Sequence, residues 1–337
     1  MSTSPHQAFV TIVTPVYNGE AYLRECIESV LAQTWQNWEY LILNNASTDG
    51  SLGIANAYAA REARIRVHSN AHTLPLVQNH NAALRLMAAP AQYCKPLMAD
   101  DWLRPQCVER LVVAAERDPA IGLVCTWAFD GQHVIGDSWP YPAARVSGRE
   151  VARAHLLEYQ RMYALGSPTT SLIRADLIRN ERTFYPEDNL LASDFQACLR
   201  VLAHADFAFV HEVLAFTRMH ETAVTSTSAR LQGGALGRMH TILKSGPDFL
   251  SAQEFAMLRA RLLDEHYRML AYQAVRRPGN VFWEFHERHL ALMGCPFDKW
   301  RLRRAVLEYL ADRALNPGEL AHSALTRLRR RRTTRAQ

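Results

Sequence analysis

The chain has 337 residues, of which 48% are hydrophobic and 21% charged, and a formal net charge of +5. This composition is typical of a globular protein with one or two domains, and no apolar run is long enough to cross a bilayer. Six arginines between positions 327 and 335 account for the positive excess, so the rest of the chain is near neutral. The six cysteines include no Cys-x-x-Cys pair, which disfavours a structural zinc site or a disulfide framework. Because the first residues lack the pattern of a signal peptide, we expect a cytoplasmic protein.

The first 130 residues alternate short strand-like runs with longer helical patterns. This alternation predicts an α/β fold with a Rossmann-like, mainly parallel sheet flanked by helices. Strands are expected at residues 9–13, 38–43, 65–68, 93–98 and 121–126, and helices at 20–33, 51–61, 76–87 and after Pro105. Residues 131–230 are less regular. From about residue 231 the pattern is helical and includes the stretches 255–276 and 300–314.

Three polar segments follow predicted strands, at Thr14–Asn18, Asn44–Asp49 and Asp100–Asp101. In parallel α/β sheets, ligands bind outside the carboxyl ends of the strands. The three segments are far apart in sequence, but we expect them to converge at this edge of the sheet. The sequence therefore predicts one active site there.

The adjacent carboxylates of Asp100 and Asp101 are the first chemical feature of that site. Burying such a pair is costly unless a cation meets it. Carboxylate oxygens suit Mg²⁺ or Mn²⁺, which keep several waters and bridge phosphates. Neighbouring side chains at a strand end point to different sides, so we expect the two residues to have different roles. A second interpretation stays open, in which Asp100 caps a turn and Asp101 is solvated.

Two segments resemble the family 2 glycosyltransferases. Residues 9–50 are similar to the N-terminal signature of that family, with Thr-Pro-Val-Tyr-Asn at 14–18 and Asn-Asn-Ala-Ser-Thr-Asp-Gly at 44–50. Met98–Pro105 resembles its metal-binding Asp-x-Asp region. The resemblance implies the GT-A fold, in which a nucleotide-binding sheet is continuous with an acceptor-binding part.

The same resemblance divides the chain. It implies a glycosyltransferase domain over residues 8–230, with a donor-binding half at about 8–130 and an acceptor half at about 131–230. We expect a helical C-terminal region over 231–325 and a basic, disordered tail over 326–337.

The resemblance also implies the residues that bind the nucleotide sugar. Thr14, Pro15 and Tyr17 are expected against the base, with packing in a turn as the other interpretation of Tyr17. Asn45 stands where many family members carry an Asp that accepts a hydrogen bond from the base. An Asn oxygen also accepts, and the amide adds a donor, so the identity of the base stays open. Asn81 matches a family Asn near the donor, although such residues are often structural.

Three further residues are expected around the diphosphate. Asp100 is expected toward the ribose, and Asp101 as the ligand of Mn²⁺ or Mg²⁺. His220, in an Arg-x-His element, is the second expected metal ligand, and a polar residue with only protein partners is the other interpretation. The metal would neutralise charge on the departing nucleoside diphosphate.

An inverting transferase also needs a base that removes the proton of the acceptor hydroxyl. The family supplies an acid at the start of a helix well after the metal site, and Asp194 matches it. We expect Ser193 to cap this helix, with Asp194 in the first turn, where the helix dipole favours ionisation. Acids are also enriched in first turns for stability alone, so that role stays open. Asp188 is the next candidate base.

The expected function is inverting transfer of a sugar from a nucleoside-diphosphate sugar to a hydroxyl of a growing glycan, polysaccharide or lipid-linked acceptor. A sugar nucleotidyltransferase is disfavoured because Thr14–Glu20 has one Gly and no basic residue to grip a triphosphate. The alternative from another class is a non-catalytic protein that binds a nucleotide sugar, nucleic acid or a membrane. The arginine tail fits peripheral contact with anionic lipid at the inner membrane face. Nucleic acid is the less favoured partner, and a solvated terminus is a third interpretation.

Overall fold

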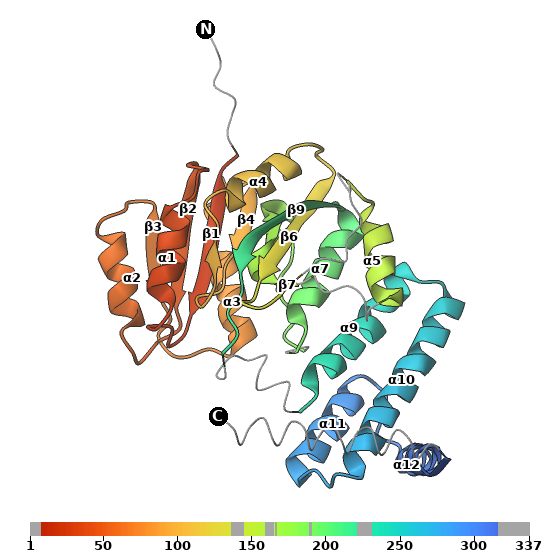
Figure 1. Ribbon diagram of the computed structural model, residues 1–337. Coiled ribbons are helices and arrows are strands. Elements are labelled where there is room, and N and C mark those ends of the chain that lie inside the picture. The colour runs from red at the N-terminus through yellow and green to blue at the C-terminus, as the bar shows by residue number, and fades with distance from the viewer. Residues whose placement is uncertain are drawn as a thin grey trace. The chain divides into compact units, whose positions relative to one another are not determined.

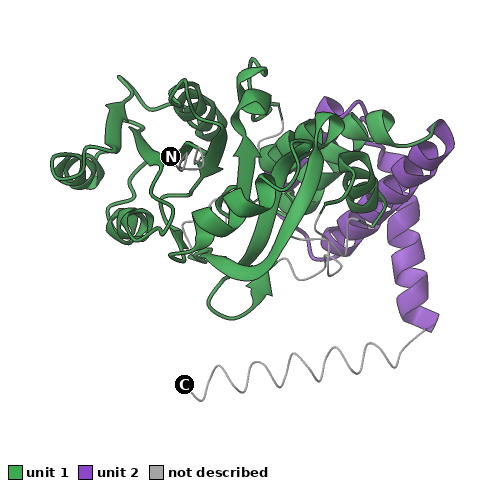
Figure 2. Ribbon diagram, turned by 90° about the horizontal axis from the view of Figure 1, so that it is seen from above, with its two compact units in different colours: residues 1–251 green, residues 252–337 purple. Residues whose placement is uncertain are grey.

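The computed structural model describes residues 8–135, 145–158, 165, 167–188, 191–220 and 231–315. The chain divides into two compact units, Met1–Ser251 and Ala252–Gln337 (Figure 2). The helix α9 (Gly233–Phe249) belongs to the first unit, although the predicted helical region begins at residue 231. The predicted domain boundaries stay a prediction. The arginine tail lies outside the described residues.

The first unit is built around one β-sheet. Among the described residues it contains nine strands in the order β3-β2-β1-β4-β8-β6-β9-β5, with β7 paired to β6 (Figure 1). The strands are β1 (Val10–Val16), β2 (Trp38–Asn44), β3 (Ile65–Ser69), β4 (Tyr93–Pro96), β5 (Trp102–Leu103), β6 (Ile121–Phe129), β7 (Val134–Ile135), β8 (Ser171–Arg174) and β9 (Asp206–Phe216). The first four are parallel, as are β6 and β9, while β8 and β5 run antiparallel to their neighbours. The predicted mainly parallel α/β sheet is confirmed.

Helices line both faces of this sheet (Figure 1). The first unit contains α1 (Leu23–Leu31), α2 (Ser51–Ala59), α3 (Leu76–Arg85), α4 (Cys107–Ala115), α5 (Gly148–Leu157), η1 (Pro168–Thr170), α6 (Ala175–Arg179), α7 (Ser193–His204) and α9. Helices α1 and α4 share a core with β1, β2 and β6. Helix α3 packs on β1 and β2, and α7 packs on β6. Because helices cover both faces, β1 and β2 are buried along their whole length.

The first strand is longer than predicted. β1 continues through Thr14 and Pro15 to Val16, paired with Ile42, Leu43 and Asn44 of β2. Proline removes a backbone donor and is rare in central strands. It is tolerated here because β4 pairs with β1 only as far as Val13. The missing N–H of Pro15 points to the side where β4 has already ended.

The second unit is helical. It contains α10 (Ala252–Ala274), α11 (Asn280–Leu292) and α12 (Lys299–Leu315), which confirms the helical stretches predicted at 255–276 and 300–314. Its core uses one stripe of α10, including Leu258, Leu262 and Leu270. All six cysteines of the chain are free and buried, as expected for small apolar side chains. No helix within the described ranges has the length and hydropathy needed to span a bilayer.

Candidate active site

Two loops at the carboxyl edge of the sheet are joined by hydrogen bonds. Asn18, just after β1, has a φ of 50° and accepts a bond from the Thr48 N–H at 2.8 Å. The Asn18 N–H donates to Ser47 Oγ at 3.0 Å, and the Gly19 N–H donates to Ser51 Oγ at 2.8 Å. The loops after β1 and β2 therefore form one connected rim, as the predicted convergence requires.

Asp49 acts within this rim as a turn residue. Its Oδ1 accepts bonds from the Ser51 N–H at 3.0 Å and the Ser51 hydroxyl at 2.6 Å. Its Oδ2 accepts the Glu20 N–H at 3.0 Å. These bonds lie at the start of α2 and tie it to the loop after β1.

Asp101 lies in the turn after β4 and is only 4% exposed. Its Oδ2 accepts a hydrogen bond from the Thr169 hydroxyl of η1. Its Oδ1 accepts the Arg218 N–H, just beyond β9, at 2.8 Å. Burial raises the pKa of Asp101 to about 7, and the neighbouring Asp100 charge adds to the rise, while the bond from Thr169 opposes it. The carboxylate is held by two segments distant in sequence but is short of positive charge.

Asp100 points to a different side. Its Oδ2 lies 2.9 Å from His220 Nε2, and its carbonyl oxygen accepts Arg218 Nε at 3.0 Å. The Arg218 guanidinium also pairs with Glu25 and lies 4.6 Å from the centre of the Tyr22 ring. Thus α1, the turn after β4 and the segment after β9 meet at one point. The structure groups His220 with Asp100 rather than with Asp101.

These side chains fit part of a divalent cation site. The raised pKa of Asp101 marks a buried carboxylate that a cation would stabilise, and Asp100 and His220 supply oxygen and nitrogen atoms beside it. In the part of the chain that the structure describes, no group of three or more His, Cys, Asp or Glu side chains gathers as a ready-made metal cage.

Lys95 is the residue that sequence reasoning missed. It lies in β4 with no exposed surface, and its Nζ donates to the carbonyl oxygens of Pro96 at 2.7 Å and Thr169 at 2.6 Å. Burial lowers its pKa, and the nearby Asp101 charge opposes that effect. Lys95 thus fixes η1, whose Thr169 hydroxyl holds Asp101. A lysine inside the otherwise apolar run from Tyr93 to Met98 was the available signal.

Asp194 lies in the first turn of α7, as predicted, but Ser193 does not cap the helix. The N-cap position is Ala192, which makes no side-chain cap bond. Only Ala205 separates α7 from β9, and α7 packs on the neighbouring β6. The start of α7 therefore lies toward the edge where β6 and β9 end. Burial raises the pKa of Asp194 to about 6. The Phe195 N–H, which donates to Asp194 Oδ1 at 2.8 Å, lowers the pKa by a smaller amount.

The predicted base-binding residues differ in exposure. Thr14 is fully buried and accepts a hydrogen bond from the Tyr40 hydroxyl at 2.9 Å, so its side chain serves the core. Pro15 is also buried within β1. Tyr17, the first residue after the strand, is 52% exposed at the rim. Of these three, Tyr17 has the side chain that a ligand can reach.

The side chains of the two predicted amide ligands are bonded to other parts of the protein. Asn45 Oδ1 accepts the Leu74 N–H at 2.9 Å and Asn70 Nδ2 at 2.8 Å, while Asn45 Nδ2 donates to the Leu74 carbonyl at 2.9 Å. Asn81 donates to the Tyr185 carbonyl at 2.8 Å and accepts the Tyr185 N–H at 2.9 Å. Both amides fix loops near the site. Their contact with a donor stays a prediction.

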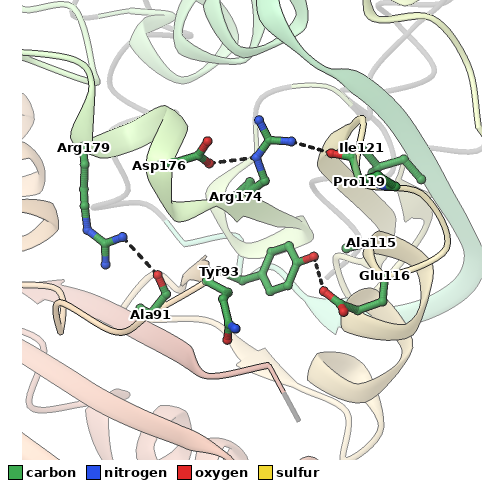
Figure 3. Close-up of a pocket in the computed structure, with 10 residues that line it drawn as sticks. Ala91, Tyr93, Ala115, Glu116, Pro119, Ile121, Arg174, Asp176 and Arg179 are labelled. Atoms are coloured by element: carbon green, nitrogen blue, oxygen red, sulfur yellow. Dashed lines mark hydrogen bonds and ion pairs between the residues drawn. The ribbon is translucent and has the colours of Figure 1, made fainter. Parts of the chain in front are cut away.

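A pocket of about 420 Å³ lies at the opposite edge of the sheet, where β4 and β6 begin and β8 ends (Figure 3). Its polar side chains are bonded to neighbouring groups of the protein. Arg174 Nε donates to Asp176 Oδ1 at 2.8 Å, Arg179 donates to the Ala91 carbonyl at 3.0 Å, and the Tyr93 hydroxyl donates to Glu116. Because this pocket is far from the paired carboxylates along the strands, it is not the candidate active site.

Two solved structures share the fold of this chain. S. aureus TarS 1-349 in complex with UDP-GlcNAc superposes with a TM-score of 0.61 at 17% identity, covering 77% of this chain and 72% of that one. The mannosyltransferase PcManGT from Pyrobaculum calidifontis, in complex with GDP-Man and Mn²⁺, superposes with a TM-score of 0.53 at 14% identity, covering 93% and 87%. These likenesses confirm the predicted fold class.

The sequence match is more specific. The family model described as Glycosyl transferase family 2 matches residues 11–178, which include β1 to β4, the carboxylate pair and η1. The chain belongs to glycosyltransferase family 2. The predicted family and enzyme class are therefore confirmed.

Two curated relatives show how far the similarity extends. An uncharacterized glycosyltransferase of Haemophilus influenzae is 24% identical over 227 residues, covering 64% of this chain and 67% of the relative. Glycosyltransferase GlyA of Streptococcus pneumoniae is 31% identical over 137 residues, covering 39% of this chain and 19% of GlyA. The chain thus spans about two thirds of the first relative's length and about a fifth of the second's.

Proposed function

We propose that the protein transfers a sugar, with inversion, from a nucleoside-diphosphate sugar to a hydroxyl group of a glycan or lipid-linked acceptor. The observation that carries this proposal is a convergence at the carboxyl edge of the sheet. Asp100, which pairs with His220, and the buried Asp101 next to it follow β4, and the loops after β1 and β2 form the connected rim at the same edge. TarS and PcManGT, which share the fold, were solved with UDP-GlcNAc and GDP-Man. A nucleotide sugar bound at this edge would bring its diphosphate to the carboxylates.

Asp101 would hold Mn²⁺ or Mg²⁺, with Asp100 directed to the ribose or sharing the metal with His220. When bound, the cation supplies charge neutralisation for the departing diphosphate. The chain supports this arrangement by fixing Asp101 between the Thr169 hydroxyl and the Arg218 N–H. Tyr17, exposed at the rim, would stack on the nucleoside base, while Asn45 and Asn81 support the loops around it.

Asp194 would be the base. The acceptor oxygen attacks the anomeric carbon, its proton passes to the Asp194 carboxylate, and the bond between the anomeric carbon and the diphosphate oxygen breaks. A pKa of about 6 suits this task, since the group is mostly ionised at neutral pH yet still takes up a proton. The competing candidate, Asp188, is bonded by Lys244 at 3.0 Å; burial acts to raise its pKa, but the lysine outweighs burial and the pKa is lowered.

A donor screen tests the proposal. The protein is incubated with UDP-, GDP- and dTDP-sugars with Mn²⁺ or with EDTA, and thermal shift and release of the nucleoside diphosphate are measured. We expect one donor class to stabilise the protein and to be turned over only with the metal. If a donor binds but no nucleoside diphosphate is released, whether or not an acceptor sugar is added, the result would instead support a non-catalytic protein that binds nucleotide sugars. If no donor binds, the glycosyl-transfer proposal fails.

A further inference from the structure

Helix α12 has apolar side chains on two opposite sides. One side faces α10, where Ala305 is buried and the Tyr309 ring lies 6.0 Å from Tyr272. A surface helix normally needs no second apolar stripe, because its other side faces water. Four large apolar residues elsewhere on α12 are nevertheless exposed: Trp300 by 76%, Leu307 by 68%, Leu310 by 47% and Leu315 by 81%.

These exposed residues form one outer face. Trp300 and Leu307 are seven residues apart, two helical turns, and therefore lie on the same side of the helix. Leu310 and Leu315 flank that line in the following turns. Single exposed apolar residues are ordinary, but a row of this kind along one helix indicates a binding surface. We call Trp300, Leu307, Leu310 and Leu315 the outer face of α12, which Figure 1 labels and Figure 2 colours with the second unit.

The outer face is bordered by positive charge. Lys299, Arg301, Arg303 and Arg304 all lie in the first two turns, and the first acid of the helix is Glu308. Arg301 pairs with Asp264, and Arg304 pairs with Glu308 at 2.7 Å. The Arg303 guanidinium lies 4.9 Å from the centre of the Trp300 ring, so a cation and an aromatic ring point outward together. The sequence that follows α12 adds six arginines between 327 and 335.

We propose that the outer face of α12 docks on an anionic lipid surface. Trp300 and Leu307 would enter the headgroup boundary, and the arginines around them would contact lipid phosphates. Nucleic acid would account for the arginines but leave Leu307 and Leu315 in water. A second copy of the chain would cover the leucines, but α12 carries more basic than acidic side chains, so two copies of this helix would repel each other. The combination of apolar and basic side chains therefore favours lipid.

This inference goes beyond the proposed sugar transfer and does not depend on it. Docking through α12 would keep the second unit at a membrane surface without any membrane-spanning helix among the described residues. It would also bring the enzyme to lipid-linked acceptors. The test measures lipid binding alone, so its outcome is separate from that of the donor screen.

The experiment is co-sedimentation of the full-length chain with vesicles. One set contains equal parts of phosphatidylglycerol and phosphatidylcholine, and the other contains phosphatidylcholine alone. We expect binding to the anionic vesicles only, weakened by added salt because screening reduces the attraction. The double variant Trp300→Ser/Leu307→Ser should lower the partition coefficient by about tenfold or more. Because both side chains are exposed, its thermal unfolding should match that of the wild type.

A matched control changes two exposed apolar residues elsewhere in the same unit. Met257 in α10 and Val281 in α11 are 67% and 70% exposed, and the variant Met257→Ser/Val281→Ser should bind vesicles like the wild type. The proposal is overturned if the wild type does not bind anionic vesicles at low salt, or if Trp300→Ser/Leu307→Ser still binds fully. It is also overturned if size-exclusion chromatography shows a dimer that this variant dissociates, since the outer face would then join two copies.

Discussion

At the scale of single residues, the two candidate bases are distinguished by their neighbours. Asp188 has Lys244 within 3.0 Å, which holds it ionised. Among the described residues, backbone N–H groups and the more distant charge of Arg238 oppose the effect of burial on Asp194, and its pKa rises to about 6. A carboxylate kept short of cationic partners is the better proton acceptor near neutral pH.

The variant Asp194→Asn should separate catalysis from folding. We expect kcat for transfer to fall by at least about a hundredfold, with little change in donor affinity, because a general base acts on the acceptor. In the wild type, transfer should rise with pH through about 6 as Asp194 ionises. Asp188→Asn is the matched control and should keep most of the activity. Equal losses of binding and turnover in Asp194→Asn would assign Asp194 a structural role.

Asp194→Asn should also change how the free energy of unfolding depends on pH. The pKa of Asp194 is higher in the folded chain than its ordinary value of 3.8, so the stability this group contributes is present at low pH and is lost as pH rises through about 6. Asp194→Asn should therefore raise the free energy of unfolding by about 1–2 kcal/mol at pH 8 and leave it nearly unchanged or lower at pH 4. Thermal unfolding at the two pH values measures the difference. A loss of stability at pH 8 would contradict the burial of an ionised Asp194.

Replacing Lys95 should change both the stability of the protein and its affinity for the donor. Lys95→Met should lower the free energy of unfolding by about 2–4 kcal/mol, because buried carbonyl oxygens of Pro96 and Thr169 lose their donor. It should also weaken metal-dependent donor binding, since η1 no longer holds Asp101. Lys299→Met, at an exposed position, is the control and should leave both quantities nearly unchanged. Wild-type donor affinity in Lys95→Met would remove the link between Lys95 and the site.

At the scale of elements, α9 supports the start of α7. Gly237 of α9 approaches the segment before Asp194 so closely that an added Cβ would lie 2.5 Å from Leu191 Cβ and 2.8 Å from its backbone carbonyl carbon. Thr241, one turn later, donates to the Ala192 carbonyl at 3.5 Å. The position of the candidate base therefore depends on a helix about forty residues later in sequence.

Two alanine variants on α9 test this dependence. Gly237→Ala should displace Leu191 and lower kcat by about tenfold, because a small misplacement of a catalytic group is costly. Gly234→Ala is the matched control, since nothing lies within 4 Å of the added Cβ. It should keep full activity and the same or higher stability, as alanine favours helix. Full activity of Gly237→Ala would show that α9 does not position Asp194.

Some helices and strands could be predicted from the sequence, and other features of the fold could not. The alternation of strands and helices up to residue 126 is predicted well, because apolar periodicity reports burial directly. The end of β1 is predicted too early, since Thr14 and Pro15 look like loop residues. They are accommodated in the sheet by the Tyr40 hydroxyl and by the early end of β4, which are tertiary features. The carboxylate pair is visible in sequence, but its direct partners, Thr169 and Arg218, come from two distant segments, and Lys95 acts through its bond to the Thr169 carbonyl.

At the scale of the whole molecule, the first unit contains the paired carboxylates, the candidate base and the rim formed by the loops after β1 and β2. The second unit contains none of these and carries the basic, apolar outer face of α12. This distribution fits the two proposals: the first unit would perform the transfer, and the second would bring the enzyme to lipid. The outer-face variant Trp300→Ser/Leu307→Ser should accordingly keep wild-type turnover with a water-soluble acceptor.

The most direct test of the central claim is turnover of the accepted donor by Asp101→Asn. This variant keeps the shape of the side chain but removes the charge that would hold the metal. We expect metal-dependent release of the nucleoside diphosphate to fall by at least about a hundredfold, with EDTA causing no further loss. Asp176→Asn, a half-exposed carboxylate at the opposite edge of the sheet, should behave like the wild type. Wild-type turnover by Asp101→Asn, still abolished by EDTA, would show that the metal binds elsewhere and would contradict the site described here.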